Sequence, residues 1–306
     1  MLAYKEGDTV LQELHPATIL CYLAVVVAGA LLLTHPTLLL VILIPVLLTL
    51  FGSGGGPSWL SSVKYFVIMM VMFMVINALV NNLGRTILWS GGNLPVLGRV
   101  TISLEVLVYS LVMGLRLLIV YSAFILYNHI LDPDRALSLL SGVFPRSTLL
   151  VALATKSIPY LGQQLHRVAE IQQTRGIRYH GGGLFQRARN RIPLLKVVFL
   201  SSLEDSFNLG ESIQARAYGT GPRTCYSRLS IKPLDSIILL VSLAAAAVMA
   251  WSSRAGFGSL QFFPTLAGSL VSYPIIRAGG IAALCLTLPA AVNWGCARWR
   301  YFTWKT

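Results

Sequence analysis

Long apolar stretches alternate with short polar ones along the chain, and one polar interval of about a hundred residues interrupts them. A helix needs about 20 apolar residues to cross the hydrocarbon core of a bilayer. Six stretches meet or approach that length, at residues 17–34, 36–51, 60–80, 105–128, 234–252 and 270–294. The first two are short and meet at the turn sequence Thr34-His35-Pro36. A re-entrant hairpin is therefore the alternative to two crossings for that pair.

The polar interval, 131–232, has the apolar period of long amphipathic helices. One stripe recurs at intervals of three or four residues through Ala154, Ile158, Leu161, Leu165 and Val168. A second stripe runs through Leu200, Leu203, Phe207, Gly210, Ile213 and Ala217. The polar face of this second helix carries Glu204, Asp205, Asn208, Glu211 and Ser212. The interval therefore predicts two amphipathic helices outside the membrane rather than a loop.

Prolines and glycines indicate where these two helices begin and end. Pro159 should kink or divide the first helix, because proline removes a backbone donor. Pro193 suits the first turn of the second helix. Residues 176–191 between them are rich in glycine and arginine and contain no acid, which favours a turn close to anionic lipid headgroups.

These patterns predict an all-α, polytopic membrane protein with about six transmembrane helices. Residues 1–130 form an N-terminal membrane domain of four spans, 131–232 a coupling domain, and 233–306 a membrane hairpin with a basic tail. Asp132 and Asp134 follow the fourth span and are typical of a helix start. A metal site of the D-x-D kind is the alternative for this pair.

Composition supports a membrane protein, because 55% of the residues are apolar, 11% are charged and the mean hydropathy is +0.70. A soluble domain has about a quarter of its residues charged. The net charge is +13, and basic residues gather in 131–232 and after the last span. Basic segments beside membrane spans stay cytoplasmic, so we expect this interval and both termini in the cytoplasm of a multi-pass cell-membrane protein. Anionic lipid and an acidic protein partner explain the charge better than nucleic acid does.

A charged sequence is repeated within the polar interval, as EIQQTRG at 170–176 and ESIQARA at 211–217. Each copy has a glutamate five residues before an arginine, and small residues on both sides of that arginine. The pairs are Glu170 with Arg175 and Glu211 with Arg216, and the small neighbours are Thr174, Gly176, Ala215 and Ala217.

Both copies fall where a predicted helix ends. Small neighbours allow a second backbone to approach, and a guanidinium presents five donors in a planar fork. The repeat predicts two docking points for an acidic partner. The alternative is that each arginine only complements a helix dipole.

Known catalytic motifs are missing from the sequence. The glycine-rich segments at 52–58 and 180–184 lack the Lys-Ser/Thr pair of a P-loop, so we expect no ATP binding by this chain. The pattern indicates a non-enzyme with no cofactor, no metal and no catalytic residue of its own.

Arg116 stands within the fourth predicted span. An arginine at the centre of a membrane helix costs about 2.5 kcal/mol or more. We expect a structural role: snorkelling, pairing with Glu105 or Glu13, or holding two helices together. Asn77, Asn81 and Asn82 are further candidates for hydrogen bonds between helices.

Several segments together resemble the transmembrane T component of energy-coupling factor (ECF) importers for vitamins and metals. They are LHPATIL at 14–20, GLRLL at 114–118, LDPDRALSLL at 131–140 and, most specifically, RIPLLKVVFLSSLEDSFNLGESIQARAYG at 191–219. The chain departs from the family pattern at Thr18-Ile19, where Thr-Lys is usual. The repeat motifs read Thr-Arg-Gly and Ala-Arg-Ala where Ala-Arg-Gly is usual.

The resemblance implies a non-catalytic coupling subunit. Two cytoplasmic ABC-type ATPases, which hold the ATP and Mg²⁺, would bind the helix ends at Arg175 and Arg216. A membrane S component would bind the vitamin or transition-metal ion. The rival hypotheses are a self-contained permease or channel, and a membrane-embedded enzyme with Asp132 and Asp134 as metal ligands.

Overall fold

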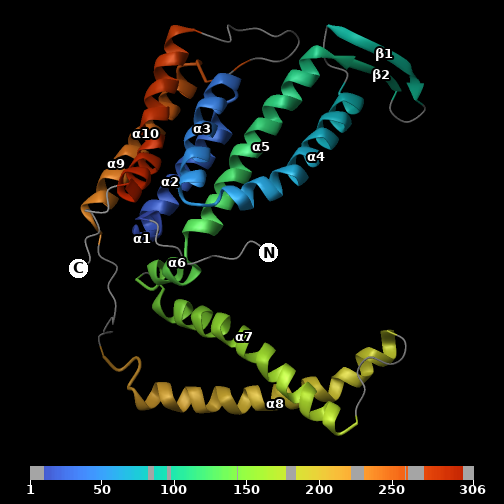
Figure 1. The fold of residues 1–306 in the computed structure, drawn as a ribbon, viewed down its shortest axis with the longest axis vertical. Coiled ribbons are helices and arrows are strands. Elements are labelled where there is room, and N and C mark those ends of the chain that lie inside the picture. The colour runs from blue at the N-terminus through green and yellow to red at the C-terminus, as the bar shows by residue number, and fades with distance from the viewer. Residues whose placement is uncertain are drawn as a thin grey trace. The chain divides into compact units, whose positions relative to one another are not determined.

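The computed structural model describes residues 10–81, 86–94, 98–142, 144–176, 184–221, 231–258, 260 and 272–298. Almost all of the elements in these ranges are helices (Figure 1). The helices are α1 (Val10–Glu13), α2 (Pro16–Leu32), α3 (Pro36–Gly52), α4 (Gly56–Val80), α5 (Leu104–Ile130), α6 (Pro133–Leu140), α7 (Pro145–Thr174), α8 (Leu184–Ala215), α9 (Pro233–Arg254) and α10 (Tyr273–Arg298). The predicted helical membrane class is confirmed.

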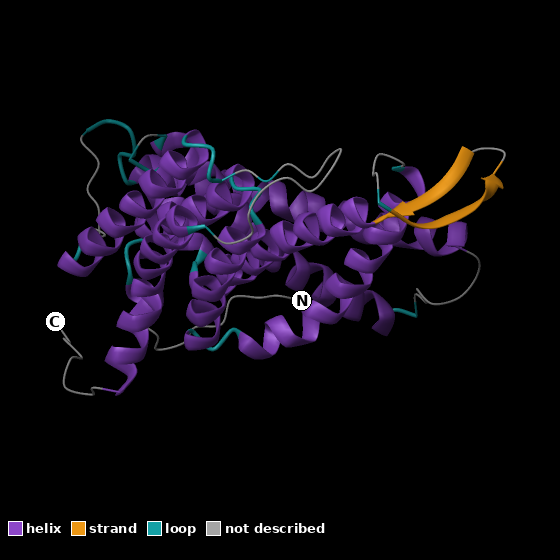
Figure 2. Ribbon diagram, turned by 90° about the horizontal axis from the view of Figure 1, so that it is seen from above, coloured by secondary structure: helices purple, strands orange, loops and turns teal. Residues whose placement is uncertain are grey.

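Two strands were not anticipated. β1 (Ile87–Leu94) and β2 (Gly98–Ser103) pair antiparallel between α4 and α5. Figure 2 shows them as the orange hairpin beside otherwise helical elements. β1 contains Gly91, Gly92 and Asn93, which are residue types depleted in strands.

The chain divides into two compact units, which are described separately below. The membrane unit comprises residues 1–136 and 230–306, and the coupling unit comprises residues 137–229. The coupling unit lies within the predicted coupling domain, 131–232.

In the membrane unit, all six predicted apolar segments are helices. Four of them, α4, α5, α9 and α10, are long and apolar enough to cross a membrane. The other two, α2 and α3, have 17 residues each.

The two ends of α2 are tied to the two ends of the α9 region. The amide of His15 donates to Asp235 Oδ1 at 2.8 Å where both helices begin. The amide of Thr34 donates to the carbonyl of Gly258 at 2.9 Å where both end. Because α2 reaches as far as α9, which is of spanning length, this geometry favours a crossing for α2 over the re-entrant alternative.

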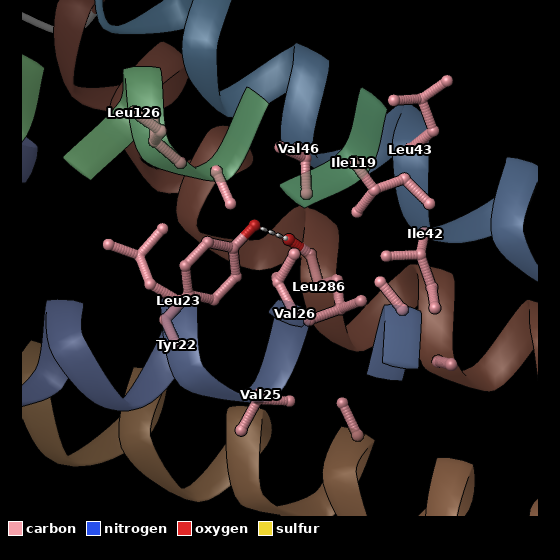
Figure 3. Close-up of a cluster of buried hydrophobic side chains, with 14 of the residues drawn as sticks. Tyr22, Leu23, Val25, Val26, Ile42, Leu43, Val46, Ile119, Leu126 and Leu286 are labelled. Atoms are coloured by element: carbon pink, nitrogen blue, oxygen red, sulfur yellow. Dashed lines mark hydrogen bonds between the residues drawn. The ribbon is translucent and has the colours of Figure 1, made fainter. Parts of the chain in front are cut away.

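The core of the membrane unit lies where α2, α3, α5 and α10 meet. Figure 3 shows Tyr22 and Val26 of α2 facing Val46 of α3 and Leu286 of α10. The hydroxyl of Tyr22 donates to the carbonyl of Leu286 at 3.3 Å. Along the uniformly apolar α3, buried Leu39, Ile42, Val46 and Leu50 recur at helical spacing. Leu40, Ile44 and Leu48 lie on the other side of α3 and are exposed, as expected for a helix with lipid on one side.

The structure tests two predictions about prolines in the coupling unit. The helix α7 continues through Pro159, so of the two predicted outcomes, a kink or a division, the division is excluded. The prediction for Pro193 is wrong. The helix α8 begins at Leu184, which places Pro193 in its interior rather than in its first turn. Of the predicted turn at 176–191, residues 184–191 are therefore helical, and residues 177–183 lie outside the described ranges.

Candidate docking site at two helix ends

The helices α7 and α8 pack against each other in the coupling unit, and one carboxylate joins them. Asp205 Oδ2 accepts hydrogen bonds from the hydroxyl of Tyr160 at 3.2 Å and from Gln164 Nε2 at 3.1 Å. Gln164 and Asp205 are 41 residues apart, which is also the offset between the two repeat motifs. The hydrogen bond therefore joins equivalent positions of the repeat. The sequence contained this signal, but we had assigned Asp205 to the polar outer face.

This pairing places the two arginines at equal distances from the hydrogen bond that joins the helices. Arg175 follows Gln164 by eleven residues, and Arg216 follows Asp205 by eleven. At a rise of about 1.5 Å per residue, each arginine lies about 17 Å along its helix from the joining hydrogen bond. Figure 1 shows the C-terminal ends of α7 and α8 pointing in opposite directions. The two arginines can thus be about 35 Å apart.

The end of α7 places Arg175 at the C-cap position. Its backbone amide donates to the carbonyl of Gln172 at 3.2 Å. The amide of Gly176 donates to the carbonyl of Gln173 at 2.9 Å, and the φ of Gly176 is +88°. Glycine occupies this left-handed position at low cost because it lacks Cβ.

The end of α8 shares the left-handed residue after its arginine, although the amide of Arg216 donates four residues back, to the carbonyl of Ser212 at 3.2 Å. Arg216 is the C-cap, and the amide of Ala217 donates to the carbonyl of Gln214 at 2.8 Å. The amide of Tyr218 donates to the carbonyl of Ile213 at 3.3 Å, which completes a Schellman motif. Ala217 has a φ of +54° and is the one left-handed residue other than glycine in the described ranges. A left-handed alanine costs roughly 1–2 kcal/mol.

The small residue after each arginine therefore has a conformational reason that sequence reasoning missed. We had attributed Gly176 and Ala217 to close approach of a partner. The structure shows that the chain turns left-handed at both positions, which directs it away from the helix axis immediately after the arginine.

All eight residues predicted at the two ends are exposed: Glu170, Thr174, Arg175, Gly176, Glu211, Ala215, Arg216 and Ala217. Glu170 Oε1 lies 3.6 Å from His166 Nε2. In the part of the chain that the structure describes, neither Arg175 nor Arg216 forms a salt bridge. The structure thus presents two matched guanidinium groups to solvent, at the opposite ends of one helix pair.

The faces by which α7 and α8 pack differ from the predicted stripes. Leu161, Leu165 and Val168 are partly buried as expected, whereas Ala154 and Ile158 are exposed. On α8 the buried side chains are Leu194 and Val198. The predicted stripe members Leu200, Leu203 and Phe207 are exposed, so the apolar stripe of α8 faces away from α7.

Arg116 of α5 contacts the end of α2. Its Nη2 donates to the carbonyl of Leu33 at 3.0 Å, and its Nη1 lies 3.6 Å from Met113 Sδ. The carboxylates considered as partners bind elsewhere: Glu13 Oε2 contacts Lys232 Nζ at 3.2 Å, and Glu105 Oε1 accepts from the amide of Thr86 at 3.1 Å.

Asn77 supplies one of the expected hydrogen bonds between helices. Its Nδ2 donates to Ser110 Oγ at 3.0 Å, which joins α4 to α5. Asn81 donates to Asn77 within α4, and Asn82 lies outside the described ranges.

The aspartates after α5 form a helix start, as predicted. Asp132 Oδ1 accepts from the amide of Asp134 at 3.0 Å, and Asp132 Oδ2 lies 3.9 Å from Arg135 Nε. Among the described residues, no three histidine, cysteine or acidic side chains gather in a way that could hold a metal ion.

Comparison with known proteins finds a family model that matches most of the chain. The family model described as cobalt transport protein, CbiQ, matches residues 7–226, which include both helix ends. The chain belongs to this family. The resemblance that the sequence motifs indicated is confirmed, and the protein is a membrane component of a transporter.

Curated relatives carry the name energy-coupling factor transporter transmembrane protein EcfT. The protein from Brevibacillus brevis is 30% identical over 104 residues, which are 34% of this chain and 39% of the relative. The one from Lactobacillus helveticus is 33% identical over 101 residues, covering 31% and 36%. The one from Bacillus selenitireducens is 35% identical over 104 residues, covering 33% and 39%. Each match thus spans less than half of the relative's length.

Proposed function

We propose that this chain is the non-catalytic coupling subunit of an ECF-type importer. Two cytoplasmic ABC-type ATPases bind and hydrolyse ATP with Mg²⁺, and each engages one arginine-bearing helix end. The chain transmits their motion to a membrane S component, which releases a vitamin or a transition-metal ion inside the cell. The chain itself binds no cofactor.

The observation that carries this proposal is the match between Arg175 and Arg216. Both are exposed C-cap residues followed by a left-handed residue, and both lie about 17 Å from the hydrogen bond that joins the helices. Arginines that only complement a helix dipole need neither equal distances from this hydrogen bond nor the same left-handed turn after them. Two ATPase subunits of the same kind of fold, by contrast, need two equivalent docking points that are far enough apart to enter separate grooves.

The joined helices can act as a lever because they move as one body. Asp205 holds Tyr160 and Gln164 at the pairing, so displacing one helix end turns the other. When ATP binding closes the ATPases, the ends approach each other, and the connections at α6 and α9 pass this motion to the membrane unit. The excess of positive charge around the coupling unit supports a cytoplasmic location for it and for both termini.

Affinity purification of the full chain from its native membrane tests the proposal. The wild-type chain should carry two P-loop ATPases per chain, and R175A/R216A should carry none. The matched control is R167A/R191A, which removes two exposed arginines elsewhere on α7 and α8 and should leave the ATPases bound. Co-purification that persists in R175A/R216A, or solute flux in vesicles that hold this chain alone, would contradict the proposal.

A further inference from the structure

Among the described residues of the coupling unit, nothing covers the apolar stripe of α8. Leu194 and Val198 face α7 and are buried. On the opposite side of the helix, Phe185 is 85% exposed and Phe199 is 66% exposed, and Ile192 and Leu195 lie with them at helical spacing. The same strip continues to Phe207, which is 74% exposed. An exposed apolar strip of this length marks an interaction surface.

The charge along α8 reverses about midway while the apolar strip continues. Residues 184–200 contain Arg187, Arg189, Arg191 and Lys196 and no acid. Residues 201–216 contain Glu204, Asp205 and Glu211 against the single Arg216. One occupant of uniform chemistry therefore does not fit both halves of the strip.

The cations of the first half flank the apolar strip. At 100° per residue, Arg189 and Lys196 lie along one border of the strip through Ile192, and Arg191 lies along the other. Phenylalanine and leucine on one face with arginine and lysine at its borders are typical of helices that lie in the membrane interface. Such a helix buries its apolar face about 5–10 Å into the boundary between headgroups and acyl chains, and its cations meet the lipid phosphates.

We infer that residues 184–200 of α8 bind the surface of an anionic phospholipid membrane, and that the acidic half of α8 does not. An apolar strip bordered by cations favours lipid as the occupant, and an anionic membrane surface attracts the first half of the helix and repels the second. Arg216 is thereby kept away from the membrane surface, on the half of α8 that is left for protein contacts. The inference does not depend on the proposed ATPase docking, because it concerns only the opposite half of the helix.

Depth-dependent quenching of a fluorophore on the full chain tests this inference. Single cysteines would replace Phe199 or Phe207 in a chain whose four native cysteines are changed to serine, and each would carry the fluorophore. Phe199 and Phe207 form a matched pair, because both are exposed phenylalanines on the strip, one in each half. The chain is reconstituted in vesicles of phosphatidylcholine alone, or of phosphatidylcholine with phosphatidylglycerol, in both cases with a trace of nitroxide-labelled lipid.

We expect strong quenching at position 199 only when phosphatidylglycerol is present, and it should be at least about threefold stronger than at position 207. Molar salt should reverse this quenching. R189E/R191E/K196E should abolish this quenching, while R167E on α7 should not. Equal quenching at both positions, or quenching that ignores the anionic lipid, would overturn the inference. The inference would also be overturned if lipid never quenches the fluorophore at position 199 while bound ATPases or an S component shield it. In that case the occupant of the strip is a protein.

Discussion

The membrane unit and the coupling unit use their charged side chains in opposite ways. In the membrane unit, Asp235 is 1% exposed and accepts hydrogen bonds from two backbone amides, those of His15 and Lys232, both at 2.8 Å. Arg116 is partly buried and donates to the carbonyl of Leu33. In the coupling unit, Arg175 and Arg216 are exposed at the helix ends. The difference teaches that Asp235 and Arg116 serve contacts inside their own unit, whereas the two arginines at the helix ends are left for partners.

The largest expected effect comes from removing both presented charges. R175A/R216A should abolish uptake in cells that hold the complete transporter, because removing one partner of a buried charge pair costs about 3–5 kcal/mol, or at least about a hundredfold in affinity per arginine. Membrane insertion and the thermal stability of the purified chain should stay as in wild type. Uptake by the double variant at the wild-type rate would show that these arginines are not the docking points.

The internal charges should show the reverse behaviour. D235A leaves the amides of His15 and Lys232 without their acceptor in a buried place, and hydrogen bonds to charged groups contribute about 1.5–3 kcal/mol each. We expect a loss of about 3–5 kcal/mol in the unfolding free energy of the full chain in detergent. D235N retains one carbonyl oxygen and should lose less. A D235A chain that melts like wild type while losing its ATPases would reverse the comparison between the units.

The contrast between the units also explains what the sequence alone could predict. Apolar length was enough for the six long helices of the membrane unit, though not for the short α1, and glycine and arginine at the end of a stripe indicated both helix ends. The buried side of α3 was not predictable, because Leu39 faces the core and Leu40 faces outward although the two residues are identical. Only packing against neighbouring helices distinguishes them.

In the coupling unit, the sequence did not reveal that α7 continues through Pro159, where a kink or a division was expected, or what Asp205 binds. Pro193 was expected in a first turn, but it lies inside α8. Neighbouring turns and tertiary packing can stabilise a helix that lacks one backbone donor. Asp205 was assigned to the outer face because it is charged, yet it accepts the hydrogen bonds that join α7 to α8.

A smaller effect is expected from loosening that pairing. D205A removes the acceptor shared by Tyr160 and Gln164 in a partly exposed place, so it should cost about 1–2 kcal/mol. Spin labels at the two helix ends should report a broader distance distribution, and ATP hydrolysis should become less coupled to uptake. E204A changes the exposed neighbour and is the matched control. An unchanged distribution in D205A would mean that apolar contacts alone hold the two helices together.

The smallest expected effects distinguish the two helix ends from each other. Gly176 and Ala217 occupy the same left-handed position, with φ values of +88° and +54°. A217G should therefore strengthen the end of α8 by about 0.5–1 kcal/mol, because glycine pays no Cβ penalty there. G176A should weaken the end of α7 by a similar amount. Hydrogen exchange measures both effects locally, at the backbone amides of positions 217 and 176. In the wild-type chain these amides donate to the carbonyls of Gln214 and Gln173. Opposite changes in protection would establish a conformational requirement, whereas equal losses of ATPase affinity in both variants would instead show that a partner reads the side chain at each position.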